Sequence, residues 1–317
     1  MDSSGNIIGG ENIFSRNVIS GNDAHGISIF GVKNQILGNY IGVASDSETP
    51  LPNHTGVRLW ISAESNIIGG VESGEANIIA HNLNAGISTS AGDNSKPDPE
   101  FPIKNEFRGN QIFGNGGLGI DLAGDQVTAN DLDDLDSGAN GLQNFPVLTK
   151  VPNSFMVDVT LNSLPDIGYA IDFYRNDTCD SSDHGQGQIY LGTKFEQIDS
   201  SGSVNFKFLA DDAEAGDFIT ATATDHLGNT SEFSACVQID GTPPDTPTPT
   251  HTATPPPAET GTATPTLAAS YTPTSSPTAT ATRAGEMTPT PTMTKTAVPD
   301  PNLNNDYFNY LPVIIHD

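Results

Sequence analysis

The stretch Asn6-Ile7-Ile8-Gly9-Gly10 decides the fold, because it returns sixty residues later as Asn66-Ile67-Ile68-Gly69-Gly70. Two further motifs keep the same offset: residues 17–22 recur at 77–82, and residues 26–29 recur at 86–89. Self-similarity at a fixed period is typical of a solenoid, in which each repeat stacks on the next.

A shorter period lies inside the sixty-residue unit. A Gly-apolar-x-apolar tetrad begins at glycines spaced 30, 30 and 33 residues apart, namely Gly26, Gly56, Gly86 and Gly119. Asn-x-apolar segments follow the tetrads and alternate in polarity, which favours short strands over helices. Gly-Asn pairs such as Gly38-Asn39 indicate turns. The pattern predicts an all-β chain whose residues 1–124 form a parallel β-helix of about four to five coils.

Stacking explains the residue types. Each coil's inward apolar residue would meet water if the coil stood alone, so Ile27, Val57 and Ile87 are expected in one buried column. Asn at the corners tolerates the left-handed conformation, and its amide can bond to the Asn of the next coil. An ordinary antiparallel β-domain is the alternative, but it would not require matched Asn corners.

The charge balance excludes some partners. The chain has 317 residues, a formal charge of −27 and a pI near 4.2. Nucleic acid and anionic membranes require basic surface, so neither is expected as a partner. The sequence contains no run of about 18 apolar residues, so no membrane span is predicted. Solubility, cation binding or saline surroundings would each account for the acidity.

The N-terminus contains no signal peptide. The chain enters a strand motif at Asn6 with nothing before it to cap a solenoid, which would leave an open sheet edge. We therefore expect an N-terminally truncated chain that has lost a signal peptide and earlier coils.

Residues 125–144 form an acidic connection between the two expected domains. Calcium prefers several closely spaced carboxylate and carbonyl oxygens, and this segment offers Asp131, Asp133, Asp134 and Asp136. The full EF-hand spacing with its distal Glu is absent. Bound Ca²⁺ and a solvated acidic linker are both open. A loop at 91–104, rich in proline, is expected as an insertion on one side of the solenoid.

Longer strands are expected between residues 145 and 241, at 155–161, 169–174, 189–193, 204–209, 218–224 and 232–239. About seven alternating strands in this length suggest an immunoglobulin-like β-sandwich. Residues 225–229 are expected as a hairpin turn. Cys179 and Cys236 lie here, and in an oxidising compartment a disulfide would close about 57 residues and stabilise the fold by about 3–4 kcal/mol. Two free thiols are the alternative.

Residues 242–301 consist almost wholly of Thr, Pro, Ala and Ser. Such a segment buries little apolar area, so we expect a disordered, extended stalk with the composition of O-glycosylated spacers. An apolar cluster follows within the tail, residues 302–317. It could dock as a strand on a neighbour, act as a recognition tag, or remain disordered.

Residues 5–240 resemble bacterial right-handed parallel β-helix repeat proteins of the CSLREA-containing type. The matching stretches are 38–42, 66–70, 116–122, 142–148, 219–225 and 228–234. The name-giving Cys-Ser-Leu-Arg-Glu-Ala element is absent, which agrees with a truncated front. The Thr/Pro stalk with a terminal Tyr-Leu-Pro-Val is similar to that of exported proteins from filamentous Chloroflexota-like bacteria. The resemblance implies a secreted or cell-surface location and no settled activity.

Outward positions of the tetrads carry little catalytic chemistry. They are occupied by Ser28, Arg58, Ser88 and Asp121. Arg58 and Asp121 lie two coils apart, about 10 Å by the spacing of strands, and no paired carboxylates accompany them as hydrolysis requires. The seven histidines show no metal-ligand spacing. An enzyme is therefore not expected; a polysaccharide lyase or glycoside hydrolase acting on acidic polysaccharide is the alternative.

Phe30 and Trp60 provide a lead toward binding. Both follow their tetrads at the same offset, so both are candidates to face outward beside Arg58, where an aromatic pair can stack on a sugar. The alternative is that both rings turn inward and pack. We predict a monomeric surface module with a structural or adhesive role, or one that binds extracellular glycan or a surface protein, through Phe30, Arg58, Trp60 and Asp121.

Overall fold

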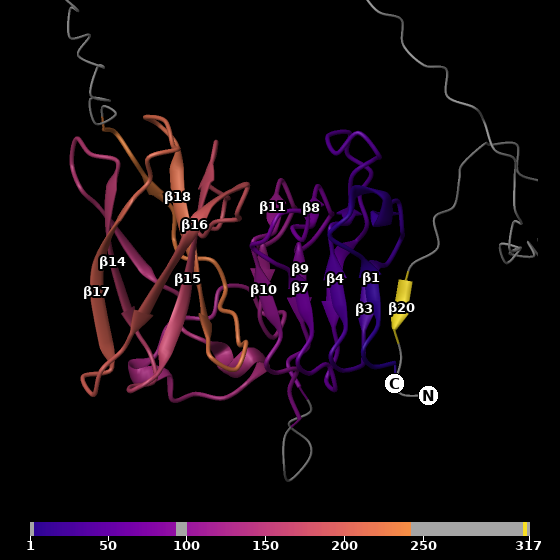
Figure 1. Ribbon diagram of the computed structural model, residues 1–317, viewed down its shortest axis with the longest axis horizontal. Coiled ribbons are helices and arrows are strands. Elements are labelled where there is room, and N and C mark those ends of the chain that lie inside the picture. Colours follow the sequence, from indigo (N-terminus) through magenta and orange to yellow (C-terminus); the bar gives the residue numbers. More distant parts are fainter. Residues whose placement is uncertain (1–2, 93–99, 242–312, 316–317) are drawn as a thin grey trace, which may run out of the picture. The chain divides into compact units, whose positions relative to one another are not determined.

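The computed structural model describes residues 3–92, 100–241 and 313–315, and the statements below concern these residues. They form strands joined by loops and by short 3₁₀ helices, in a solenoid followed by a second all-β part (Figure 1). None of the helices in this part of the chain is long and apolar enough to cross a membrane. The predicted stalk at 242–301, most of the tail and Pro97 and Pro99 of the predicted loop lie outside the described residues.

The solenoid is built from three parallel sheets, which contain in order β1-β4-β7-β10, β2-β5-β8-β11 and β3-β6-β9-β12. Its strands are β1 (Ile7–Gly9), β2 (Val18–Ile19), β3 (His25–Ile29), β4 (Gln35–Leu37), β5 (Tyr40–Ile41), β6 (Thr55–Leu59), β7 (Ile67–Gly69), β8 (Ile78–Ala80), β9 (Ile87–Thr89), β10 (Glu106–Arg108), β11 (Gln111–Phe113) and β12 (Ile120–Asp121). The 3₁₀ helix η1 (Ile13–Ser15) joins β1 to β2. The described chain therefore makes about three turns from β1 to β10, where four to five coils were predicted.

The predicted column of apolar side chains is present. Parallel pairing places Ile27 opposite Val57 and Val57 opposite Ile87, and all three are fully buried. The tetrad glycines are required by the close approach of neighbouring coils. A Cβ on Gly26 would lie 2.8 Å from the carbonyl oxygen of Gly56, and one on Gly56 would lie 2.4 Å from that of Gly86.

Asparagine side chains bond from coil to coil in three ladders, as the corner residues predicted. One ladder runs through Asn22, Asn53, Asn82 and Asn115. In it, the side-chain amide of each Asn donates to Oδ1 of the next, over 2.7, 3.0 and 2.9 Å in turn. The others run through Asn6, Asn34, Asn66 and Asn105, and through Asn17, Asn39, Asn77 and Asn110. Their members are mostly buried, so these bonds satisfy polar groups that would otherwise be costly inside the fold.

The acidic connection, residues 125–144, packs against the solenoid. It contains η2 (Leu132–Asp134) and η3 (Ala139–Leu142). Asn140 is fully buried, and its Oδ1 accepts a 3.0 Å bond from the backbone N–H of Asn105. This bond extends the ladder that begins at Asn6 by one step. Since Ala139 is also fully buried, this segment covers one end of the solenoid core instead of forming a wholly solvated linker.

The second part consists of two antiparallel sheets that share an apolar core, here called the sandwich. One sheet has the order β13-β14-β17 and the other β16-β15-β18-β19. The strands are β13 (Val147–Lys150), β14 (Met156–Asn162), β15 (Gly168–Asn176), β16 (Ile189–Gln197), β17 (Ser203–Leu209), β18 (Phe218–Asp225) and β19 (Val237–Gln238). Phe173 and Phe208 stack face to face between the sheets at 3.8 Å between ring centroids.

The predicted strand at 232–239 is largely wrong, because only Val237 and Gln238 form a strand there. The preceding residues instead bond through their side chains: the hydroxyls of Ser231 and Ser234 accept bonds from the backbone of Ala223 and Ala221. The predicted hairpin turn is present, with the backbone N–H of Asp225 bonded to the carbonyl of Asn229 at 3.1 Å.

Cys179 and Cys236 form a disulfide, with their Cα atoms 6.0 Å apart. The bond connects the loop after β15 to the segment before β19, and the chain between the two cysteines contains β16, β17 and β18. Of the two states that the sequence left open, the structure has the paired one, and no cysteine of the described residues is free.

The sandwich docks on the last coil. Oε1 of Gln186 accepts a 3.0 Å bond from the side-chain amide of Asn115, so Gln186 ends the ladder that begins at Asn22. Ile112 and Gly187 exchange two backbone hydrogen bonds of 2.7 Å. Phe233 and Tyr174 belong to the apolar core of the solenoid although they come from the sandwich. The two parts thus share one continuous set of contacts.

A last strand comes from the C-terminal tail. β20 (Val313–Ile315) pairs in parallel with β3 and adds a fifth strand to that sheet, beside the first coil (Figure 1). Strand docking was one of three outcomes that the sequence left open for this segment.

Candidate functional site

The outward positions of the β3-β6-β9-β12 sheet lie in register. Ser28 is opposite Arg58, Arg58 is opposite Ser88, and Ser88 is opposite Asp121. The repeat pattern of the tetrads therefore located this row correctly. Ser28 and Ser88 are buried, whereas Arg58 and Asp121 are half-buried. The two ionisable members are the accessible ones.

Phe30 and Trp60 stack on each other at the end of this row. Their ring centroids are 5.3 Å apart and their planes differ by 6°. Neither ring belongs to the solenoid core, and both are half-buried, so the inward-packed alternative is not what the structure has. The Arg58 guanidinium lies 5.2 Å from the Trp60 ring. A flat aromatic surface beside a hydrogen-bond donor is suited to a sugar ring.

Two histidines that the sequence reading passed over join this group. The ring of His25 lies 6.0 Å from that of Trp60 and 6.4 Å from that of His54. Burial, with help from Arg58 and then His54, lowers the pKa of His25. Nδ1 of His25 and Nε1 of Trp60 are enclosed and have no hydrogen-bond partner among the residues that the structure describes. Such groups call for a bound water or ligand as an explanation.

Arg58 and Asp121 influence each other across the row. Burial lowers the pKa of Arg58, and Asp121 opposes that shift. Burial likewise raises the pKa of the Asp121 carboxyl, whose Oδ1 accepts a 3.2 Å bond from the backbone of Gln126. Arg58 donates a short hydrogen bond to Ser88. These contacts hold the guanidinium along the row instead of leaving it to move in solvent.

Three of the four predicted calcium ligands come together. Carboxylate oxygens of Asp131, Asp134 and Asp136 lie within 4.8 Å of one another. Asp133 is outside the group: its N–H donates to Oδ1 of Asn162 at 2.8 Å, and its carboxylate accepts a 3.3 Å bond from the side-chain amide of Asn162. The structure thus brings together three of the four aspartates that the sequence spacing singled out.

Carboxyl groups of this cluster have raised pKa values. Burial raises the pKa of Asp134 to about 6, and neighbouring Asp136 and Asp131 add to the shift. Burial and Asp131 also raise the pKa of Asp136. Oδ1 of Asp131 is buried and has no hydrogen-bond partner within residues 3–92, 100–241 and 313–315. A cation among these oxygens would relieve the repulsion and satisfy the unpaired atom.

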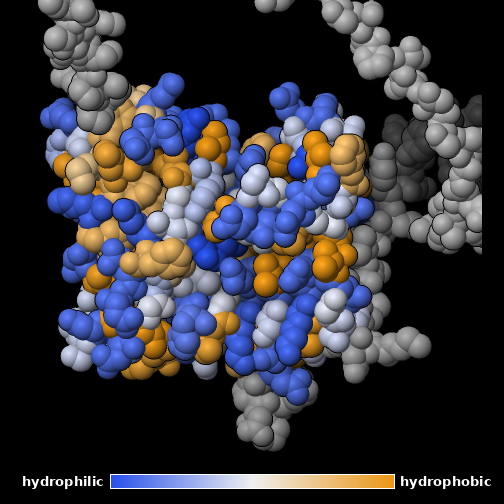
Figure 2. Space-filling view, viewed as in Figure 1, coloured by the Kyte–Doolittle hydropathy of each residue, from blue (hydrophilic) through white to orange (hydrophobic). Residues whose placement is uncertain are grey.

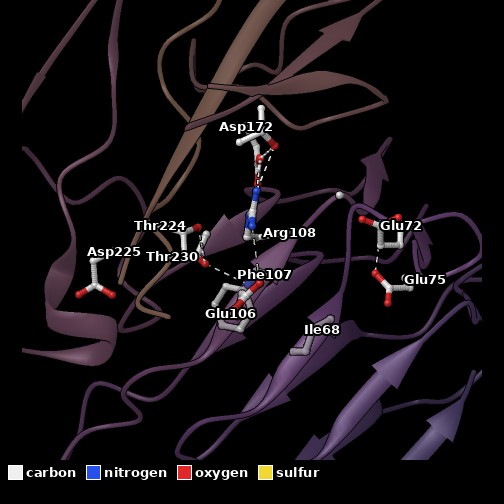
Figure 3. A network of polar contacts seen from close by, with 12 residues as sticks. Ile68, Glu72, Glu75, Glu106, Phe107, Arg108, Asp172, Thr224, Asp225 and Thr230 are labelled. Carbon is white, nitrogen blue, oxygen red and sulfur yellow. Dashed lines mark hydrogen bonds and ion pairs between the residues drawn. The ribbon is translucent and has the colours of Figure 1, made fainter. Parts of the chain in front are cut away.

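A polar network at the junction of solenoid and sandwich was not foreseen (Figure 3). Arg108 of β10 donates bonds of 2.7 and 2.8 Å to the fully buried carboxylate of Asp172 in β15. Burial alone would lower the pKa of Arg108, but the bonds to Asp172 raise it above its ordinary value. The pair fixes the sandwich on the solenoid. Nothing in the sequence around either residue indicated that the two would meet.

A hollow of about 420 Å³ opens beside this network, lined by Glu106, Tyr169, Phe195, Asp225 and others. The Phe195 ring is 76% exposed. In the space-filling view, hydrophobic residues gather over the sandwich at the upper left, whereas hydrophilic and hydrophobic residues are interspersed over the rest of the visible face (Figure 2). Arg108 is committed to Asp172, so it does not offer a free cation to a ligand here.

No protein-family model and no curated protein sequence matches the chain.

Proposed function

We propose that the protein is a secreted or cell-surface repeat protein that binds extracellular glycan, or a surface protein, through the outward face of the β3-β6-β9 sheet. The observation that carries the proposal is the stacked pair of Phe30 and Trp60 with Arg58 beside it. The pair supplies a flat apolar surface, Arg58 supplies hydrogen-bond donors, and Asp121 supplies an acceptor farther along the row.

The proposal includes the finer architecture expected from the sequence. The solenoid is of the right-handed, CSLREA-containing type, and the sandwich is immunoglobulin-like. The parallel sheets, the antiparallel two-sheet part and the disulfide support this arrangement. Disulfides persist in oxidising compartments, which favours an exported protein.

A glycan array tests the binding proposal. We expect wild-type protein to bind a subset of glycans and Trp60→Ala to weaken binding about tenfold or more, because the stacking surface is lost. Phe14→Ala is the matched control, since Phe14 is 94% exposed in the first coil and lies apart from the stacked pair. No binding at all, or binding that ignores Trp60, would refute the proposal.

The enzymatic alternative has its own readout. Release of unsaturated uronides from pectin or alginate in the presence of calcium would replace simple binding by lyase chemistry. Monomeric behaviour in solution is expected in either case.

A second proposal is a structural Ca²⁺ site at Asp131, Asp134 and Asp136, supported by their mutual distances and by the unpaired Oδ1 of Asp131. We expect calcium to raise the Tm by roughly 2–4 °C at tenfold excess over Kd. Asp131→Asn should abolish the shift. Asp133→Asn, in the same loop but outside the group, should preserve it; equal shifts in both variants would contradict the site.

A further inference from the structure

The hollow beside the Arg108–Asp172 pair, here called the junction hollow, has the form of a small-molecule site. Its volume is about 420 Å³, and it lies where β10 of the solenoid meets β15, β16 and β18 of the sandwich. Its walls combine Phe195, Tyr169 and Ala170 with a few charged and polar side chains. Concave surfaces of this size, in which apolar walls surround a small number of polar groups, are where small ligands usually bind.

Phe195 offers an open aromatic surface at the junction hollow. The residue is 76% exposed, although a ring of this size would gain stability from burial. The Arg108 guanidinium lies 6.0 Å from the ring centroid, so the ring already lies near one cation. The exposed part of the ring can stack on the flat face of a sugar or attract a further cation.

The charged groups of the junction hollow are mainly acidic. Among the described residues that line it, Glu106, Glu196 and Asp225 carry carboxylates, and Arg108 is the one Lys or Arg. The charge of Arg108 is offset by Asp172, which is fully buried and accepts bonds of 2.7 and 2.8 Å from it. The hollow therefore attracts a positively charged ligand and repels an anionic one, such as a chain of uronic acids.

Glu106 is only weakly paired within the fold. Burial raises its pKa; Arg108 opposes this shift, whereas Asp172 and Glu75 add to it. The ion pair with Arg108 is long, with 3.9 Å between Nη1 and Oε1 of Glu106, because the guanidinium is bonded to Asp172. A ligand ammonium group beside Glu106 would supply the countercharge and the short hydrogen bonds that Arg108 does not give.

A second hollow, here called the solenoid hollow, continues from the first. Its volume is about 320 Å³, and Glu106 and Arg108 line both hollows. The solenoid hollow adds the carboxylates of Glu11 and Glu75 and apolar side chains from β4 and β7. Figure 3 shows Glu106 between Asp225 on the sandwich side and Glu75 on the solenoid side. Such an arrangement suits an elongated ligand whose positive charges repeat along its length.

We propose that the two hollows together bind a linear oligosaccharide of amino sugars. Its ammonium groups lie beside Glu106, Glu196 and Glu75, and one of its rings stacks on Phe195. The charge of the ligand follows from the carboxylates, its rings from the exposed aromatic surface, and its length from the shared lining of the two hollows. The site lies on the side of the β1-β4-β7-β10 sheet, so it does not depend on the proposed function of the β3-β6-β9 face.

Titration calorimetry with a hexamer of β-1,4-linked glucosamine tests the site. The full chain is measured at about pH 6, where exposed carboxylates are ionised, and at about 0.15 M salt, where a Debye length of about 8 Å weakens attraction by distant charges. We expect one-to-one binding. The N-acetylated hexamer has the same rings without the positive charges, and should bind at least about tenfold more weakly. Equal binding of the two hexamers would overturn the proposal.

Single substitutions locate the ligand. Phe195→Ala changes an exposed position, so it should leave the fold intact and weaken binding about three- to fivefold. Glu106→Gln removes a carboxylate with little change of shape and should weaken binding about tenfold. Glu214→Gln is the matched control, because it removes an exposed negative charge of the sandwich outside both hollows. Equal losses in Glu214→Gln and Glu106→Gln would show diffuse attraction to an acidic protein, and the site would be abandoned.

One further variant and one further ligand separate the alternatives. Trp60→Ala should bind the glucosamine hexamer like the wild type. Binding that is lost in Trp60→Ala and kept in Phe195→Ala would move the sugar to the β3-β6-β9 face and overturn the present assignment. Spermine has the charges of the hexamer but no ring to stack, so it should bind more weakly. Tighter binding of spermine that ignores Phe195→Ala would identify an aliphatic polyamine and overturn the sugar assignment.

Discussion

The two ends of the solenoid solve the same problem to different degrees. At the last coil, the described residues bring Gln186 and Asn140 to two of the ladders, and Phe233 to the apolar core. At the first coil, Oδ1 of Asn22 has no hydrogen-bond partner in the described part of the chain, and Ile7 is 64% exposed. The comparison shows that stacking satisfies every coil except the terminal ones, so the ends need residues that the repeat itself does not encode.

The closed end should be the more sensitive to mutation, and Phe233→Ala should have the largest effect. Phe233 is 3% exposed, and its ring lies 5.3 Å from that of Tyr174. Removing it leaves a cavity where the sandwich meets the last coil, so we expect the free energy of unfolding to fall by about 4 kcal/mol in denaturant titrations. Phe195→Ala, at a 76% exposed position of the sandwich, should change it by less than about 0.5 kcal/mol. Similar losses for both would mean that the closure by Phe233 is unimportant.

The ladder itself offers a matched pair of substitutions. Asn82 accepts two bonds from Asn53 and donates to Asn115, so Asn82→Ala strands several buried polar groups and should cost about 3 kcal/mol. Asn22→Ala removes a side chain whose oxygen has no partner, and should cost about 1 kcal/mol. Thermal unfolding of the two variants measures the difference. A cost for Asn22 equal to that for Asn82 would indicate that the first position is filled after all.

The closed end should also depend on pH. Glu232 accepts backbone bonds of 2.8 and 2.9 Å from Leu122 and Thr128, and burial raises its pKa from 4.5 to about 8. Since the folded pKa lies above the unfolded one, its stabilising contribution is complete below about pH 4.5 and is lost as the pH rises through about 8. We expect the free energy of unfolding to fall by about 2 kcal/mol between about pH 6 and 9.

Glu232→Gln separates this carboxyl from the rest. Asp134 shifts in the same direction, but its pKa of about 6 confines its loss to lower pH. The variant should therefore show a flatter profile of stability against pH than the wild type above about pH 6.5. A profile as steep as that of the wild type would assign the pH dependence to other groups.

The sequence predicted the structural features that follow from the repeat. The column through Ile27, Val57 and Ile87, and the coil-to-coil bonds of Asn, follow from spacing, because each partner lies about one period away. The outward row that contains Arg58 and Asp121 follows for the same reason. Period alone does not show where stacking stops: each of the three sheets contains four solenoid strands, which span about three turns from β1 to β10.

Contacts without a period escaped prediction. Gln186 meets Asn115 across 71 residues, and Glu232 meets Leu122 across 110. Glu232 was assigned to a strand because its surroundings alternate in polarity, but its carboxylate is used by the solenoid. Asp133 was included among the calcium ligands because spacing counts residues and does not show that its carboxylate bonds to Asn162. The position of the His25 ring beside the aromatic pair depends on the direction of its side chain, which no sequence motif predicts.

The sixty-residue duplication equals two coils, and each coil offers its neighbours the same Asn corners and the same glycine clearance. A gene that gained or lost one such unit by unequal recombination would encode a longer or shorter solenoid with unchanged terminal residues. Length in this architecture is therefore inherited in steps of whole turns, and the distance between the sandwich and the first coil can be adjusted without new core packing.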